Sequence, residues 1–205
     1  MVKPMLKPLL YLAALFLTLA AAPVPAGNPS PAAPAAPAPE DRENLIYLDV
    51  GNAHETYGRV VIKLRPDLAP KHVERIKILA RRGFYDGLIF HRVIPGFMAQ
   101  TGDPKGTGEG HSDLPDLEPE FTATPHYRGI VSMARSQASN SANSQFFIML
   151  NDKASLNNQY TVLGEVINGI KFMDRIKKGD PDNDGAVEPP ADRIIRMRVA
   201  ADVKE

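Results

Sequence analysis

The chain of 205 residues contains neither cysteine nor tryptophan, and its 24 basic residues are balanced by 24 acidic ones. Without cysteine, the protein can form no disulfide framework, zinc–thiolate cluster or iron–sulfur cluster and has no thiol nucleophile. A formal net charge of zero also removes the bulk electrostatic attraction on which nucleic-acid binding depends. We therefore expect no nucleic-acid partner, and a stability that comes from the hydrophobic core rather than from cross-links.

One long apolar run lies close to the start of the chain. Residues 9–22 follow Lys3 and Lys7 and precede Pro23-Val-Pro-Ala26, which is the order of a secretory signal peptide. The run has 14 residues, whereas a membrane-spanning helix needs roughly 17–25. We expect residues 1–26 to be a signal peptide cut after Ala26, with an uncleaved membrane anchor as the alternative. The mature protein, with 22 basic and 24 acidic residues, would then be periplasmic or secreted, without stable insertion in the membrane.

The segment after the expected cut is rich in proline and alanine. Five of the thirteen residues from Gly27 to Pro39 are proline, and none is charged. Such a composition is typical of an extended, polyproline-like spacer that buries nothing. We therefore assign residues 27–43 to a linker and residues 44–205 to the folded domain.

Within this domain, short β-rich runs alternate with turns that contain Gly, Pro, Asn and Asp. Two helices interrupt them: one begins at Pro70 and ends before Gly83, and a shorter one covers residues 170–177. The pattern predicts a mainly β fold, either a sandwich or a closed barrel. The expected strands are residues 45–50, 58–64, 88–93, 97–100, 130–134, 146–150, 160–166 and 194–199.

Most searches for catalytic or metal-binding motifs fail. The sequence has no Gly-x-Ser-x-Gly elbow, and its five histidines fall in no zinc-binding pattern. The glycine-rich segment 106–110 lacks the spacing of a dinucleotide-binding loop and is interpreted as a turn. The acidic segment 180–185 resembles the first half of a calcium loop, but Ala191 stands where a bidentate Glu is required. We interpret that segment as a solvated loop.

One combination of segments stands out from this background. Residues 90–103 read Phe-His-Arg-Val-Ile-Pro-Gly-Phe-Met-Ala-Gln-Thr-Gly-Asp, which places the cation of Arg92 and the amide of Gln100 among large apolar side chains. Residues 144–148, Ser-Gln-Phe-Phe-Ile, add a second apolar run. An arginine on an edge strand is usually solvated, so these residues alone leave open whether they form a site.

These two runs, with Gly106-Thr-Gly108 and Val131-Ser-Met-Ala134, resemble the successive signatures of the cyclophilin family of peptidyl-prolyl isomerases. They occur in the family's order and spacing, and the similarity extends over nearly all of residues 44–205. The resemblance implies an eight-stranded antiparallel β-barrel capped by two α-helices, and catalysis of X–Pro bond rotation without cofactor or metal.

The resemblance also assigns site residues by position. It implies that Arg92 is the catalytic arginine, that Gln100 steadies it, and that Phe97 belongs to both the catalytic set and the wall of the proline pocket. Two positions depart from the best-known eukaryotic members: Ser155 stands in place of a tryptophan and Tyr160 in place of a histidine. We therefore expect weak binding of the cyclic inhibitor cyclosporin. The remaining substrate-binding residues implied are Met98, Ala134, Arg135, Gln145, Phe147, Leu156 and Tyr160.

We thus expect an exported, monomeric isomerase that acts on proline-containing segments of unfolded or loosely folded exported proteins. One alternative is a non-catalytic chaperone that holds such segments in the same groove; it would not need Arg92. Another is a structural envelope protein tethered by the proline spacer, which predicts an uncut N-terminus.

Overall fold

The computed structural model describes residues 39–204, and the expected signal peptide and most of the expected linker lie outside them. The first element, helix α1 (Pro39–Arg42), lies within the segment assigned to the linker. The Arg42 guanidinium donates hydrogen bonds of 2.8 Å to the carbonyl oxygens of Ala200 and Val203. Regular structure therefore begins some residues before Asn44. Arg42 joins this first helix to the C-terminal turn η3 (Ala200–Asp202).

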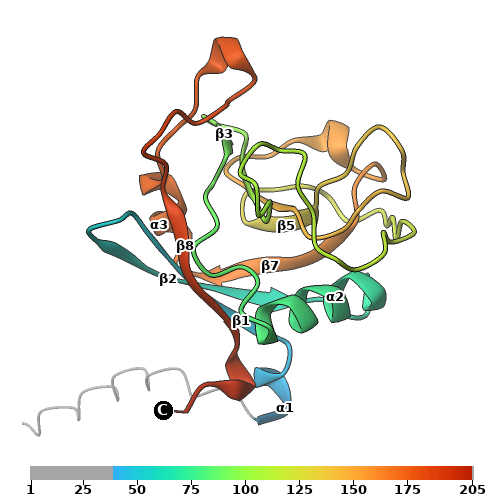
Figure 1. The fold of residues 1–205 in the computed structure, drawn as a ribbon. Coiled ribbons are helices and arrows are strands. Elements are labelled where there is room, and N and C mark those ends of the chain that lie inside the picture. Colours follow the sequence, from blue (N-terminus) through green and yellow to red (C-terminus); the bar gives the residue numbers. More distant parts are fainter. Residues whose placement is uncertain (1–38, 205) are drawn as a thin grey trace, which may run out of the picture. The chain divides into compact units, whose positions relative to one another are not determined.

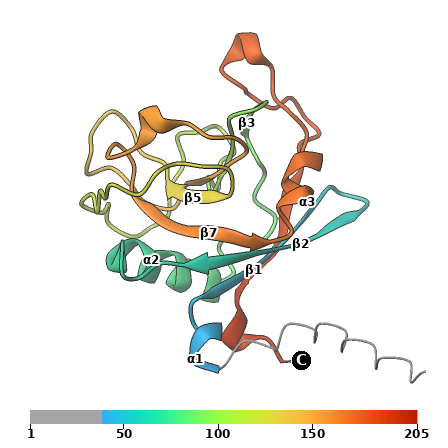
Figure 2. The ribbon, with the colours of Figure 1, turned by 180° about the vertical axis from the view of Figure 1, so that it is seen from behind.

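Eight strands form one antiparallel sheet in the order β3-β4-β6-β5-β7-β2-β1-β8 (Figures 1 and 2). The sheet curls, and the expected mainly β, eight-stranded architecture with two principal helices is confirmed. The strands are β1 (Leu45–Gly51), β2 (Thr56–Leu64), β3 (Arg92–Ile94), β4 (Met98–Thr101), β5 (Ile130–Met133), β6 (Phe146–Met149), β7 (Val162–Asn168) and β8 (Arg193–Val199).

The expected strand at residues 88–93 is mostly replaced by an irregular segment. Only Arg92–Ile94 pair regularly, as β3. Before them, the amide of Ile194 donates to the carbonyl of Leu88 at 2.8 Å, and the amide of Phe90 donates to that of Asp192 at 2.9 Å. Residues 88–90 therefore bridge the gap between the two ends of the sheet, which explains why their apolar side chains are buried or half-buried without a regular strand.

The two predicted helices are present as α2 (Pro70–Arg81) and α3 (Ile170–Arg175). Helix α2 buries Val73, Ile76 and Leu79, the apolar face that the spacing predicts. The second helix ends earlier than expected because Ile176 has extended backbone angles. Within residues 39–204, no helix combines the length and the hydropathy required to cross a bilayer.

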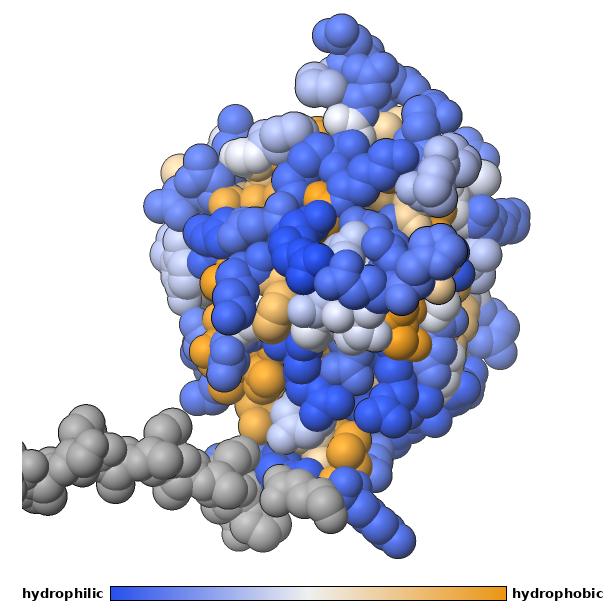
Figure 3. All heavy atoms as spheres, turned by 90° about the vertical axis from the view of Figure 1, so that its left-hand side faces the viewer, coloured by the Kyte–Doolittle hydropathy of each residue, from blue (hydrophilic) through white to orange (hydrophobic). Residues whose placement is uncertain are grey.

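Strand alternation divides the apolar side chains into two groups. Inside the curl, a large cluster includes Tyr85, Phe90 and Phe146, all at most 1% exposed. On the outer face of β3, β4, β6 and β5, a smaller cluster contains Met98 and Phe147. Figure 3 shows that the face turned to the viewer is largely hydrophilic, with apolar side chains in small separate areas.

Candidate functional site

Strand register aligns polar and aromatic side chains in one row across the outer face. Arg92 on β3 pairs with Gln100 on β4, Gln100 pairs with Phe147 on β6, and Phe147 pairs with Ser132 on β5. Directly opposed residues on neighbouring antiparallel strands lie about 4.5–5.5 Å apart at Cβ. A cation, an amide and an aromatic ring from three strands are thus neighbours, although they are distant in sequence.

A second row, beside the first, is apolar. Ile94 on β3 pairs with Met98 on β4, which pairs with Met149 on β6. These side chains belong to the outer cluster, whose buried members are Met98, Ile130, Ala134, Phe147, Met149 and Val162 and whose partly exposed members are Leu68, Ile94, Phe97, Leu156 and Tyr160. Because the second group stays partly open to solvent, this cluster forms an accessible apolar surface next to Arg92.

Side-chain amides connect Arg92 to the loop on the other side of the site. The Arg92 Nη1 donates to Gln100 Oε1 at 3.2 Å, and Gln100 Nε2 donates to Gln145 Oε1 at 2.9 Å. Gln145 Nε2 then donates to the carbonyl oxygens of Gly108 and Gly110 at 2.9 and 2.8 Å. Each amide therefore has a single orientation that satisfies both neighbours, which fixes the oxygen of Gln100 toward the guanidinium.

We call this chain of hydrogen bonds from Arg92 through Gln100 and Gln145 the amide relay. It ends at a loop that is organised by Asp103, which is 1% exposed. Its carboxylate accepts backbone N–H groups of Lys105, Thr107 and Gly108 at 2.7, 2.8 and 2.6 Å. Burial alone would raise the pKa of Asp103, but these backbone donors and that of Gly110 outweigh it and lower the pKa. Segment 106–110, predicted to be a turn, is therefore shaped around a buried carboxylate that the sequence interpretation did not single out.

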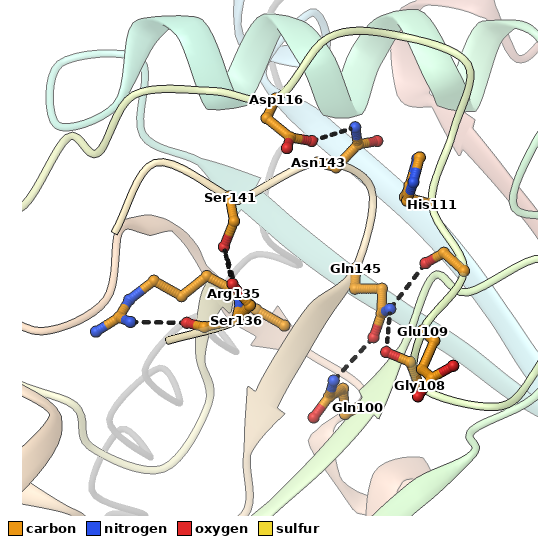
Figure 4. Close-up of a pocket in the computed structure, with 12 residues that line it drawn as sticks. Gln100, Gly108, Glu109, His111, Asp116, Arg135, Ser136, Ser141, Asn143 and Gln145 are labelled. Carbon is orange, nitrogen blue, oxygen red and sulfur yellow. Dashed lines mark hydrogen bonds between the residues drawn. The ribbon is translucent and has the colours of Figure 1, made fainter. Parts of the chain in front are cut away.

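Between this loop and residues 134–143 lies a pocket of about 330 Å³. Ala134 lines it and belongs to the apolar cluster, and Gln100, which also lines it, pairs with Phe147 of that cluster, so pocket and cluster are adjacent. Figure 4 shows Gln145 placed between Gln100 and Gly108 at one side of the pocket. The remaining lining is mostly polar and includes Glu109, His111, Asp116, Arg135, Ser136, Ser141 and Asn143.

Arg135 and Tyr160 form one side of the site. The Arg135 Nε and Nη2 donate to the carbonyl of Gln159 at 3.1 and 3.0 Å, and its guanidinium lies 4.9 Å from the centre of the Tyr160 ring. Tyr160 in turn meets Phe147 edge-on, with ring centres 5.4 Å apart. Arg135 is therefore committed largely to the backbone and to an aromatic face, and Tyr160 is part of the apolar surface.

The rim near Leu156 is formed by the short turn η1 (Ala154–Leu156). Leu156 is half-buried in the outer cluster, whereas Ser155 beside it is exposed. The Lys153 Nζ lies 5.8 Å from the centre of the Phe97 ring. Ser155 is therefore open to solvent at the edge of the outer cluster.

His126, which is 2% exposed, lies behind the aromatic ring of Phe147. Its ring stacks on Phe147 at 6.4 Å, with Nε2 2.9 Å from the Ser132 hydroxyl and Nδ1 3.3 Å from Asn157 Oδ1. Burial lowers its pKa, only partly offset by the contact with Asn157. His126 therefore packs against Phe147 and contacts the segment that carries Leu156.

The structure brings nine of the ten predicted site residues together by register, by the amide relay or by membership of the apolar cluster, and the tenth, Arg135, lines the adjacent pocket and lies against Tyr160. It also adds a residue that the sequence interpretation missed. Asp184, from the acidic segment interpreted as a solvated loop, forms an ion pair with Arg92 at 2.7 Å. The described residues contain no group of three or more His, Asp or Glu side chains that could hold a metal ion.

Comparison with known proteins identifies the family. Residues 47–199 match the family model described as cyclophilin type peptidyl-prolyl cis-trans isomerase. A probable peptidyl-prolyl cis-trans isomerase of Brucella suis is 51% identical over 175 residues, covering 80% of this chain and 86% of the relative. Peptidyl-prolyl cis-trans isomerase B of Bacillus subtilis is 39% identical over 140 residues, covering 68% and 93%.

Solved structures give the same answer. The cyclophilin AquaCyp293 of Hirschia baltica superposes with a TM-score of 0.69 at 26% identity, covering 80% of this chain and 76% of that one. A cyclophilin type isomerase of Cryptosporidium parvum, crystallised in the presence of the dipeptide Ala-Pro, gives 0.67 at 27% identity, covering 76% and 98%. Family model, relatives and fold agree, and the chain belongs to the cyclophilin-type peptidyl-prolyl cis-trans isomerases.

Proposed function

We propose that the outer face of β3, β4, β6 and β5 is the catalytic groove of this isomerase, with Arg92 as the catalytic donor. The observation that carries the proposal is the placement of an oriented guanidinium beside a partly open apolar surface. The substrates we propose are proline-containing segments of unfolded or loosely folded polypeptides. The relative crystallised with Ala-Pro supports a proline ligand for this fold.

The chemistry requires neither proton transfer nor a covalent intermediate. An X–Pro bond isomerises slowly because rotation breaks amide resonance, with a barrier of roughly 18–20 kcal/mol. In the twisted state the proline nitrogen becomes pyramidal and regains a lone pair that the planar amide lacks. A hydrogen-bond donor aimed at this nitrogen therefore binds the transition state more tightly than either ground state.

Arg92 suits this role because a guanidinium offers five N–H donors in a fixed fork. Gln100 fixes one edge of that fork from the neighbouring strand. A donor that is already oriented loses little freedom when the substrate twists. A non-catalytic chaperone would need no such donor, so the oriented Arg92 favours catalysis over simple holding.

The apolar surface has a separate task. Phe97, Met98, Phe147 and Leu156 would enclose the pyrrolidine ring while the carbonyl side rotates past it. Excluding water from this contact also strengthens the hydrogen bond from Arg92, because the local dielectric constant falls. The polar pocket beside Gln145 and Ala134 would receive the residues that precede the proline.

Replacing Arg92 with Ala tests the catalytic role. Loss of a hydrogen bond from a charged donor costs about 1.5–3 kcal/mol, and loss of a preorganised one up to about 4. A protease-coupled assay on a short X–Pro peptide should therefore show catalytic efficiency reduced roughly ten- to several-hundredfold. Arg59→Ala is a matched control, since Arg59 is an exposed arginine paired with Asp49 on another part of the sheet. Unchanged efficiency with a native circular dichroism spectrum would remove Arg92 from the mechanism.

We also propose that the protein is exported and acts on exported chains, after cleavage between Ala26 and Gly27. The proposal rests on the basic start, short apolar run and small-residue exit of residues 1–26. N-terminal sequencing of protein recovered from the periplasm or medium should find Gly27 first. An intact Met1 in a membrane pellet would instead support the anchored alternative.

A further inference from the structure

Asp184 contacts the same guanidinium that the proposed mechanism uses. The Arg92 Nη2 donates to Asp184 Oδ1 at 2.7 Å, and Nε lies 3.2 Å from Oδ2. Nε also donates to the main-chain carbonyl of Asp184 at 2.9 Å. One edge of the fork is therefore held by a carboxylate, while Nη1 is held by Gln100 from the other side.

The loop that carries Asp184 is docked on β3 by its backbone. The amide of Val93 donates to the carbonyl of Gly185, and that of Gly179 donates to the carbonyl of Val93, both at 2.8 Å. The turn η2 (Pro181–Asn183) forms the tip, and the Asp180 carboxylate caps it by accepting the amide of Asp182. In Figures 1 and 2 this connection between α3 and β8 rises beside β3. The position of Asp184 is thus set by main-chain pairing rather than by the ion pair itself.

The backbone conformation at this position favours a short polar side chain. Asp184 has φ of 49°, in the left-handed region that Asp, Asn and Gly tolerate best. The following Gly185 also has positive φ, and a Cβ there would collide with the side chain of Ile94. The turn therefore delivers a short carboxylate to the guanidinium edge.

We propose that Asp184 is a positioning residue for the isomerase reaction, an inference that rests on the catalytic role proposed for Arg92. Together, Asp184 and Gln100 engage three of the five guanidinium N–H groups, which leaves two for the substrate. An arginine held at both edges keeps its plane fixed, so the remaining donors face the groove without a further loss of side-chain freedom. The contribution is kinetic: the Asp184 side chain is 79% exposed, and exposed ion pairs add little to folding stability.

The test compares Asp184→Asn with Asp182→Asn. Asn at 184 keeps the left-handed backbone preference and the main-chain acceptor but removes the carboxylate. Asp182 is an exposed carboxylate in the same loop, so its replacement changes the charge equally without removing the contact to Arg92. Two quantities are measured on the full chain: steady-state kinetics on an X–Pro peptide, and the solvent exchange rate of the Arg92 Nε–H by NMR, assigned with Arg92→Lys.

We expect Asp184→Asn to accelerate Nε–H exchange and to lower kcat about three- to tenfold, with KM changed less than about twofold. Asp182→Asn should match the unaltered protein in both measurements. Faster exchange with an unchanged or higher kcat would overturn the proposal. The carboxylate would then either pair with the guanidinium without affecting the reaction or block the guanidinium from the substrate. Equal losses in both variants, or unaltered exchange in Asp184→Asn, would overturn it as well. If Arg92→Ala retains activity, the catalytic role of Arg92 fails instead, whereas the exchange measurement still reports on the contact.

Discussion

Replacing Asp103 with Asn should weaken both the fold and the catalytic groove. The two carboxylate oxygens accept the backbone N–H groups of Lys105, Thr107 and Gly108, and they shape the loop whose carbonyls anchor Gln145. Asn has nearly the same size but turns an NH₂ group toward donors. At least one contact therefore becomes donor against donor, inside a site that is closed to water.

The pKa of Asp103 shows which effect dominates in the buried site. It is lowered although burial acts to raise it, so the backbone hydrogen bonds outweigh the cost of burying the charge. A hydrogen bond to a charged group contributes about 1.5–3 kcal/mol, and an unsatisfied buried donor costs about 1–3 kcal/mol. Some of the loss is recovered because the carboxylate no longer has to be desolvated. We therefore expect the free energy of unfolding to fall by about 2–4 kcal/mol.

Urea unfolding at pH 7, followed by circular dichroism, measures this change. Asp113→Asn is the matched control, since Asp113 is exposed and pairs only at 3.3 Å with Arg82, itself half exposed; we expect a change within about 0.5 kcal/mol. Under native conditions, Asp103→Asn should also reduce kcat/KM, because the relay through Gln145 and Gln100 loses its anchor. A loss of stability below about 0.5 kcal/mol would refute the argument that the loop depends on this carboxylate.

Two further predictions concern pH and inhibitor binding. Burial lowers the pKa of His72, His91 and His126, so the unfolded state binds more protons than the folded state below the ordinary histidine pKa. The free energy of unfolding should therefore fall as the pH decreases through about 6.5. Urea midpoints at pH 7 and pH 5 check this, and equal midpoints would contradict it. Ser155→Trp should tighten cyclosporin binding by roughly ten- to a hundredfold with little change in turnover, since an indole adds one hydrogen bond and apolar area at the rim. Titration of both proteins tests this, and low-nanomolar binding by the unaltered protein would contradict the place given to Ser155.

Local patterns predicted most of the fold because the physics that sets them is local. Pro70 and the apolar spacing after it predicted α2 to within two residues of its end. The strands were located by alternation and by turn residues, except at 88–93. There the hydrogen bonds to residues beside β8 decide the conformation, and no pattern within the segment itself reports them.

The site was predicted by resemblance rather than by pattern. The residues alone did not distinguish Phe146, which packs inside the curl, from Phe147, which lies on the outer face. Asp184 could not be predicted, since it meets Arg92 only after 92 positions of chain have folded back onto β3. Its one sequence signal was an acidic loop, and that composition is typical of solvated turns.

The alternation along β6 has a consequence for protein engineering. Successive residues of this strand serve different purposes: Phe146 fills the interior, and Phe147 forms the groove. Because Met98 and Phe147 are themselves buried in the outer cluster, a directed-evolution library would vary the partly exposed positions 156 and 160 together while the interior remains as it is. Such a library would search ligand preference on a scaffold whose folding depends mainly on other residues, so most of its members should remain soluble enough to screen.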